Sequence, residues 1–392
     1  MQPRKIGLYI HEVLYNRGGT EAYTVRMAAA LAEIYPEARI SFVSECYAPA
    51  DYAGDGAFCG LLKERYGVEF EPGRAGLVPV RAPGDASGTG PGRLGGWLLR
   101  RRIQGASRGF DLFFYCSRGY LTFKAKHNIA VIHFPMRPRG GRRGRQDRSF
   151  VSAYDAFLPN STFTQGYLEE YWPEIPAGKI HLLYPPIAPV PDRGIAKEKL
   201  ILVCSRIDAA KKLELLIDAY RGSQFLHDNY KLVIAGNNAS DTVDYWEKIC
   251  AYAGGGDVEQ SPNPVELCPN ASWDKIAELY NRAEIFWHCK GYGEDDPYMM
   301  EHFGMTTVEA MGAGCVPVVI NKGGQAEIVT GGAGFKWDSP AELVARTEEL
   351  ARDPELLSRM SAAARQRAAF FYTDAFRERL RGILGAVFLG GN

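Results

Sequence analysis

The segment KLILVCSRIDAAKKLELLIDAY, residues 199–220, contains the alternation that decides the fold. Residues 199–207 form a short run rich in Ile, Leu and Val, which predicts a buried β-strand. Residues 212–220 place apolar side chains at helical spacing and predict an amphipathic helix. Strands that alternate with helices in this way are typical of a parallel sheet covered by helices, so the segment indicates an α/β fold.

The same rhythm occurs on both sides of a proline-rich segment, YPPIAPVPDRGIAKEK, residues 184–199. Its prolines cannot continue a helix or a central strand, so the segment predicts a linker. A chain of 392 residues also exceeds what one hydrophobic core usually organises. We therefore expect two Rossmann-like domains, residues 1–188 and 199–370, joined by a linker at 189–198. The last helix, residues 371–392, is expected to pack back towards the N-terminal domain.

Composition excludes several classes of protein. Hydrophobic residues make up 46% of the chain and charged residues 23%, as in ordinary globular proteins, and the formal net charge is zero. No global field therefore recruits nucleic acid or membrane. The eight cysteines form no Cys-x-x-Cys motif, which favours reduced thiols. The chain enters a strand without an apolar leader, and no apolar run reaches about 18 residues, so we expect a cytoplasmic protein without a membrane span.

Two segments depart from this regular pattern. Residues 73–96 are rich in Gly and Pro and lack periodicity, so they are expected to be poorly ordered. Residues 137–148, RPRGGRRGRQDR, carry six arginines against one aspartate. That loop is either a solvated surface or a patch that meets anionic lipid or a diphosphate-bearing acceptor. Arg100, Arg101 and Arg102 in the same domain favour the second interpretation, in which the protein is peripheral at the inner membrane face.

The usual nucleotide fingerprints do not occur. The first strand is followed by YNRGGTEAY rather than G-x-G-x-x-G, and there is no P-loop motif, so NAD and P-loop nucleotides are disfavoured. Gly18 and Gly19 either form a tight turn or leave N–H groups for an anion. Arg206 follows a strand and Lys211 begins the next helix. They are either solvated bases or two cations for phosphates.

The stretch YMMEHFGMTTVEAMGAG, residues 298–314, places one glutamate before a helix and another inside it. An acid/base pair would need both carboxylates about one reacting bond apart, whereas a helix turn or more separates Glu301 from Glu309. Metal ligation fits poorly because there is no His-Glu-x-x-His motif. Two separate ligand contacts fit best, with the amides of Gly304 and Met305 and the helix dipole facing the ligand.

Taken together, these motifs resemble the retaining GT-B glycosyltransferases of family 4. The resemblance rests on the Arg-x4-Lys element, on Glu-x7-Glu around Phe-Gly, and on AMGAGCVPVVINKGGQAEIV at 310–329. GGTE at 18–21, IHFP at 132–135 and LPNSTFT at 158–164 are similar to the N-terminal domain of that family. EHFGMTTVEAM and IHFP look most like the α-mannosyltransferases that extend lipid-linked oligosaccharides. The implied architecture is two Rossmann-like domains facing across a cleft.

The resemblance implies a role for each matched residue. Glu309 would bind the ribose, Arg206 and Lys211 the diphosphate, and Glu301 with the helix-start backbone the donor sugar. Lys212 stays open as an alternative to Lys211. The implied donor-binding residues are Gly18, Gly19, Arg206, Lys211, Phe303, Gly304, Met305, Thr306 and Glu309, and the implied catalytic residues are His133 and Glu301.

The implied reaction is hexosyl transfer with retention from a nucleoside diphosphate sugar, which acts as co-substrate in place of a bound cofactor. GDP-mannose is the first candidate donor and a UDP-sugar the second, and the acceptor would be a saccharide or a lipid-linked saccharide. No Asp-x-Asp motif points to a divalent metal, and residues 294–297, EDDP, are expected to form a loop. The alternatives are a GT-B sugar-nucleotide epimerase or hydrolase and a non-catalytic sugar-binding protein.

Overall fold

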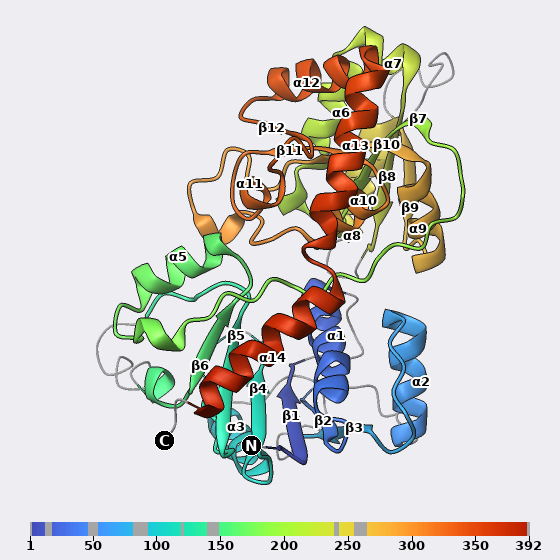
Figure 1. Cartoon of the computed structure of the whole chain (residues 1–392). Coiled ribbons are helices and arrows are strands. Elements are labelled where there is room, and N and C mark those ends of the chain that lie inside the picture. Colours follow the sequence, from blue (N-terminus) through green and yellow to red (C-terminus); the bar gives the residue numbers. More distant parts are fainter. Residues whose placement is uncertain are drawn as a thin grey trace. The chain divides into compact units, whose positions relative to one another are not determined.

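The computed structural model describes residues 2–11, 18–45, 54–80, 93–117, 119, 121–138, 149–238, 243–254 and 265–389. The chain forms two compact units (Figure 1). The first comprises Met1–Pro186 together with Thr373–Asn392, and the second comprises Ile187–Tyr372. Each unit contains one six-stranded sheet with helices packed on it.

The sheet of the first unit has the strand order β3-β2-β1-β4-β5-β6, and all paired neighbours run parallel. Its strands are β1 (Lys5–Tyr9), β2 (Arg39–Ser44), β3 (Ala75–Pro79), β4 (Leu112–Tyr115), β5 (His127–Ile132) and β6 (Ala156–Pro159). The described helices are α1 (Gly19–Ile34), α2 (Asp55–Tyr66), α3 (Arg93–Ser107), α5 (Thr162–Tyr171), η3 (Ala177–Lys179) and α14 (Thr373–Leu389). Helices cover both faces of this sheet, so strands such as β4, with sequence LFFY, are buried at every position.

The C-terminal helix α14 belongs to the core of the first unit. Phe376, Leu380 and Leu384 are buried in the same cluster as apolar side chains of α1. The Phe376 ring packs edge-on against Tyr23 of α1, with 5.8 Å between the ring centroids. An ion pair between Arg377 and Glu33 joins the exposed sides of the two helices. The chain therefore returns to its first unit after completing the second.

The sheet of the second unit has the order β12-β11-β10-β7-β8-β9 and is also parallel. Its strands are β7 (Glu198–Cys204), β8 (Lys231–Gly236), β9 (Glu266–Pro269), β10 (Ala283–His288), β11 (Val316–Ile320) and β12 (Phe335–Trp337). Its longer described helices are α6 (Leu213–Arg221), α8 (Val243–Gly254), α9 (Trp273–Arg282), α10 (Met305–Gly312), α12 (Pro340–Arg352) and α13 (Pro354–Ala369). The shorter ones are η4 (Ala209–Lys211), α7 (Gln224–Asn229), η7 (Pro297–Met299) and α11 (Gln325–Ile328).

Local sequence signals set several helix starts. The Ser161 hydroxyl accepts a hydrogen bond from the Thr164 amide and caps α5, and Ser272 caps α9 in the same way. Ser339 caps α12, and the Glu342 carboxylate accepts from the Asp338 amide at 3.0 Å. Ser339 and Glu342 thus form a capping box, except that Glu342 reaches one residue further back than the usual N-cap amide.

One expectation about order is wrong for part of its range. Within residues 73–96, the structure has strand β3 and the start of helix α3, while residues 81–92 lie outside the described residues. The β3 segment AGLVP shows no periodicity because it has only five residues and its first three positions are all buried. Pairing with β2, which a local pattern does not contain, makes it a strand.

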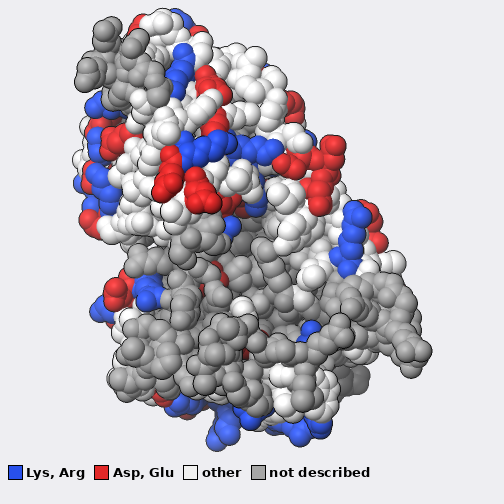
Figure 2. All heavy atoms as spheres, turned by 180° about the vertical axis from the view of Figure 1, so that it is seen from behind, with Lys and Arg blue, Asp and Glu red and all other residues white. Residues whose placement is uncertain are grey.

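Each sheet has one point where the strand order reverses, between β1 and β4 in the first unit and between β7 and β10 in the second. Open α/β sheets bind ligands outside the carboxyl ends of the strands at such a point. None of the described helices is long and apolar enough to cross a membrane. On the face of the second unit seen in Figure 2, acidic and basic side chains are interspersed, in keeping with a net charge of zero.

Candidate functional site

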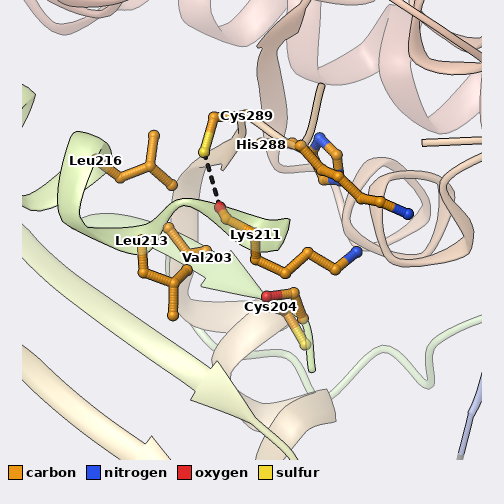
Figure 3. A pocket seen from close by; sticks show the side chains of 9 residues that line it. Val203, Cys204, Lys211, Leu213, Leu216, His288 and Cys289 are labelled. Atoms are coloured by element: carbon orange, nitrogen blue, oxygen red, sulfur yellow. Dashed lines mark hydrogen bonds between the residues drawn. The ribbon is translucent and has the colours of Figure 1, made fainter. Parts of the chain in front are cut away.

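The reversal point of the second sheet carries a small pocket. Strand β7 leads there into the turn that holds Lys211, and the neighbouring β10 leads into the segment that ends at Glu301. Figure 3 shows the side chains that line the pocket. They are Val203, Cys204, Ser205, Lys211, Leu213, Leu216, His288, Cys289 and Lys290.

Three nitrogen atoms surround one oxygen of Glu301 beside this pocket. Glu301 Oε2 lies 2.7 Å from Lys211 Nζ, 3.3 Å from His288 Nε2 and 3.8 Å from Lys290 Nζ. Burial alone would raise the pKa of Glu301. The two ammonium groups and the His288 hydrogen bond outweigh it and hold the pKa well below its usual range. Glu301 is therefore ionised at neutral pH and acts only as a hydrogen-bond acceptor.

The structure distinguishes Lys211 from Lys212. Lys211 ends η4 and directs its ammonium group at Glu301. Lys212 has a left-handed backbone, with φ of 48°, and its ammonium group lies 2.6 Å from Glu294 Oε1 instead. The Cys289 thiol donates to the Lys211 carbonyl at 3.0 Å, a contact drawn as a dashed line in Figure 3. This bond fixes the turn to the end of β10, and of the two lysines in the turn it is Lys211 whose ammonium group contacts Glu301.

Arg206 lies at the same edge of the sheet but has a different partner. It follows β7, its side chain is 57% exposed, and its Nε donates to Asp208 Oδ2 at 2.7 Å. Asp208 also accepts from the Ala210 amide and caps η4. The structure thus brings Lys211 to Glu301 and holds Arg206 beside Asp208, where its remaining donors face solvent.

Helix α10 begins beside Glu301. Gly304 has φ of 117°, and a Cβ there would lie 2.2 Å from Gln325 Nε2, so only glycine fits without strain. By helix geometry, the first amides of α10, including those of Met305 and Thr306, have no intrahelical acceptor. Phe303 is buried and packs edge-on against Phe371, with 5.4 Å between the ring centroids. The buried Phe303 anchors the turn that exposes these amides.

A second glycine turn supports Glu301 from behind. The Gly324 amide donates to the Glu301 carbonyl at 2.8 Å. Gly323 has φ of 61°, and a Cβ there would lie 2.2 Å from the same carbonyl oxygen. The Gly-Gly pair of the 310–329 motif therefore allows two backbone segments to meet, and their contact fixes the backbone position of Glu301.

Glu309 is held separately from Glu301. It lies inside α10 with 7% of its surface exposed, and its Oε2 accepts from the Tyr280 hydroxyl of α9 at 3.2 Å. Tyr280 is fully buried. The two carboxylates of the Glu-x7-Glu motif thus have different partners on different elements, an arrangement that suits two separate ligand contacts.

Three predicted residues of the first unit lie at the carboxyl edge of its sheet. His133 directly follows β5, and its ring packs edge-on against Tyr23 of α1, with 5.1 Å between the ring centroids. Gly18 is the N-cap of α1 and Gly19 its first residue. Of the arginine-rich segment 137–148, only residues 137 and 138 are described, and the Arg137 guanidinium lies over the Tyr171 ring.

A polar cluster at this edge gave no sequence signal. Glu45 follows β2, accepts a hydrogen bond from the Tyr9 hydroxyl, and has His11 Nδ1 3.6 Å from its Oε1. Burial would raise the pKa of Glu45, but these hydrogen bonds and the nearby Arg100 lower it. The result is an ionised carboxylate at the ligand-binding edge of the first sheet.

Sequence reasoning also missed His288 and Lys290. Both lie at the end of an apolar strand, since β10 ends at His288 and the chain turns at Lys290. Their chemistry depends on β10 lying next to β7, and this neighbour relation arises only from the folded sheet. Polar residues at the end of an apolar strand were the available signal.

The EDDP segment has structural partners. Glu294 pairs with Lys212, and Asp296 accepts from the Tyr298 amide at 3.0 Å and caps η7. Across the described residues, no group of three or more His, Cys, Asp and Glu side chains is arranged to hold a metal ion.

The second unit resembles a family of known proteins. Residues 191–367 match the family model described as glycosyl transferases group 1. This range lies entirely within the second unit and includes every residue placed around Glu301 and Glu309.

Curated relatives match this chain over only part of its length. The "uncharacterized glycosyltransferase MJ1607" of Methanocaldococcus jannaschii is 32% identical over 143 residues, covering 36% of this chain and 32% of the relative. The GDP-Man:Man(3)GlcNAc(2)-PP-Dol alpha-1,2-mannosyltransferase of Neurospora crassa is 25% identical over 44% of this chain and 34% of the relative. Human alpha-1,3/1,6-mannosyltransferase ALG2 is 25% identical over 58% and 57%. The chain thus matches about a third to somewhat over half of these relatives' lengths.

Solved structures match over nearly the whole chain. Anabaena Alr3699/HepE in complex with UDP and glucose has a TM-score of 0.71 at 17% identity, covering 97% of this chain and 99% of that one. Sucrose-phosphate synthase of Thermosynechococcus elongatus has a TM-score of 0.71 at 16% identity, covering 99% and 100%. At this identity the likeness concerns the fold, and it confirms the predicted α/β fold of GT-B type.

Proposed function

We propose that this chain is a glycosyltransferase that moves a sugar from a nucleoside diphosphate sugar to a hydroxyl group of a saccharide or lipid-linked saccharide. The observation that carries the proposal is the Glu301 site. An ionised glutamate lies between two lysines and a histidine at the reversal point of the second sheet, beside the start of α10. That site falls inside the range that matches group 1 glycosyl transferases.

The diphosphate would bind to cations and helix amides. Lys211 and Lys290 bring two positive charges to the single negative charge of Glu301, and Arg206 adds exposed donors nearby. The first amides of α10 supply the positive end of the helix dipole. As the sugar–phosphate bond breaks, negative charge grows on the leaving diphosphate, and these fixed groups would stabilise it.

The sugar and the nucleoside would bind to the two glutamates. Glu301 would accept hydrogen bonds from hydroxyls of the donor sugar, and Glu309, held by Tyr280, would accept from the ribose hydroxyls. Bidentate contacts of this kind orient the donor so that its anomeric carbon is presented in one way.

We propose that transfer occurs with retention and without a metal, as the resemblance to family 4 implies. The bond from the anomeric carbon to the phosphate oxygen breaks while the acceptor oxygen bonds to the same face of that carbon. The acceptor proton passes to the departing phosphate oxygen. In the first unit, His133 would be a catalytic residue, and Gly18 and Gly19 would be donor-binding residues.

GDP-mannose is the first candidate donor because two of the matched relatives are named as mannosyltransferases, one of them as using GDP-Man. A UDP-sugar is the second, because Anabaena Alr3699/HepE was solved with UDP-glucose.

Glu45 at the edge of the first sheet suits a hydroxyl-bearing acceptor. Peripheral membrane contact through residues 137–148 at the cytoplasmic face is part of the proposal, supported by the exposed Trp97 and the Arg101 guanidinium 4.7 Å from its ring centroid.

A product assay tests the proposal. The purified protein is incubated with GDP-mannose or UDP-glucose, with and without a lipid-linked saccharide acceptor, and in the presence of EDTA. Acceptor-dependent release of the nucleoside diphosphate with a glycosylated product supports transfer. Release or isomerisation of the sugar at the same rate without acceptor would identify a hydrolase or an epimerase instead.

A further inference from the structure

The two oxygens of the Glu301 carboxylate have different surroundings. All three nitrogen contacts of this side chain are made to Oε2, and none of the described residues makes a hydrogen bond or ion pair with Oε1. An ionised carboxylate can accept about four hydrogen bonds. Oε2 is therefore the anchored oxygen, and Oε1 is the one with capacity for a ligand.

The three groups on Oε2 differ in how firmly they are held. Lys211 and Lys290 reach Glu301 through flexible four-carbon stems, and their charge attracts any diphosphate that enters the site. His288 is the last residue of β10, is 4% exposed, and has a stiff ring with a strand behind it. An arriving diphosphate competes with Glu301 for the two lysines, whereas a neutral imidazole has no charge and attracts the diphosphate much less.

The protonation state of His288 supports this difference. Burial lowers its pKa and, together with Lys211 and Lys290, outweighs the Glu301 carboxylate, which would raise it. The ring is therefore neutral at pH 7 and carries one N–H. Since the ionised Glu301 has no proton to donate, that N–H must be on Nε2, which faces Oε2. The groups that face the ring and titrate are Glu301, Lys211 and Lys290.

We propose that His288 is a positioning residue that keeps Glu301 Oε1 directed at a hydroxyl of the donor sugar while the two lysines bind the diphosphate. This inference rests on the proposed function, because it assumes a nucleoside diphosphate sugar as ligand. It assigns His288 a role in recognition of the sugar and none in binding of the diphosphate.

A conservative pair of variants tests this assignment. In His288→Gln the side-chain amide can place an N–H near the position of Nε2, whereas His288→Leu keeps similar volume and removes the donor. His227→Leu, which removes an imidazole from α7 of the same unit, is the matched control. Calorimetry measures the affinity of each protein for GDP and GDP-mannose, or for UDP and UDP-glucose if the wild type prefers that pair. Thermal melting monitors folding.

We expect His288→Leu to weaken nucleotide-sugar binding about tenfold, as for loss of a hydrogen bond to a charged group, with diphosphate affinity unchanged within about twofold. His288→Gln should restore most of the loss, and His227→Leu should behave as wild type. Nucleotide-sugar binding by His288→Leu at wild-type strength would overturn the inference. So would an equal loss of both ligands in both His288 variants, because that pattern indicates packing. If the wild type binds no nucleotide or nucleotide sugar, the proposed function fails first and the inference with it.

Discussion

Replacing Lys211 by methionine removes the cation that lies closest to Glu301 and keeps the length of the side chain. Lys211 Nζ is 2.7 Å from Glu301 Oε2, and both side chains are less than a fifth exposed. Solvent therefore screens this contact less than it screens a surface ion pair. Lys212→Met is the matched control. The left-handed backbone of Lys212 disfavours lysine and methionine equally, and its ammonium group pairs with Glu294.

The magnitude follows from the contact that is lost. A hydrogen bond to a charged group contributes about 1.5–3 kcal/mol, which corresponds to roughly 10- to 150-fold in an equilibrium constant. We expect Lys211→Met to weaken nucleoside diphosphate binding by at least about tenfold, because the diphosphate loses one of its cations. Lys212→Met should stay within about twofold of the wild type, because its ammonium group faces Glu294.

Calorimetric titration of both variants with the same nucleoside diphosphate measures this difference. Melting curves show whether either protein has lost its fold, since a binding defect with an unchanged melting temperature belongs to the site. An equal loss of affinity in the two variants would refute the assignment of Lys211. A larger loss in Lys212→Met would show that the second lysine is the ligand.

Three further substitutions give distinct outcomes. Gly304→Ala should lower the free energy of unfolding by about 1–3 kcal/mol, because φ of 117° is strained for alanine and its Cβ would meet Gln325; an unfolding midpoint in urea equal to wild type would contradict this. Tyr280→Phe should weaken nucleoside diphosphate binding about fivefold, or about 1 kcal/mol, because Glu309 loses the hydroxyl that holds it. Calorimetry measures this, with inorganic pyrophosphate as the control ligand, because pyrophosphate has no ribose and its binding should not change. The depressed pKa of Glu301 stabilises the folded state above the pKa of the unfolded chain, about 4.3, and this contribution is lost as the pH falls through the folded pKa. The melting-temperature advantage of wild type over Glu301→Gln should therefore be constant from pH 7 to about 5 and shrink below that; an advantage that grows on acidification would show that the sign is wrong.

Local sequence patterns predicted most of the second unit. Apolar strands and helical spacing are signals that act over a few residues, and the structure confirms them for β7 and α6. The first unit was predicted less completely, because β3 is a five-residue strand specified by its pairing with β2, within a segment rich in Gly and Pro. Such pairing is a long-range contact that no window of the sequence contains.

The same distinction holds within the site. Glu301, Gly304 and Glu309 were predicted because one continuous motif contains the loop and the helix start. His288 was not, since its contact with Glu301 requires the end of β10 to lie beside the turn after β7. The choice between Lys211 and Lys212 depended on backbone geometry, with φ of 48° turning the second lysine away.

The central claim is that the second unit binds a nucleoside diphosphate through the Glu301 site. Calorimetric titration of the purified protein with GDP, UDP, ADP and CMP, with and without Mg²⁺, tests it most directly. We predict micromolar binding of one nucleoside diphosphate, unchanged by Mg²⁺, with GDP as the first candidate. Absence of binding by all four nucleotides would contradict the claim, and binding that requires Mg²⁺ would contradict its metal-independent form.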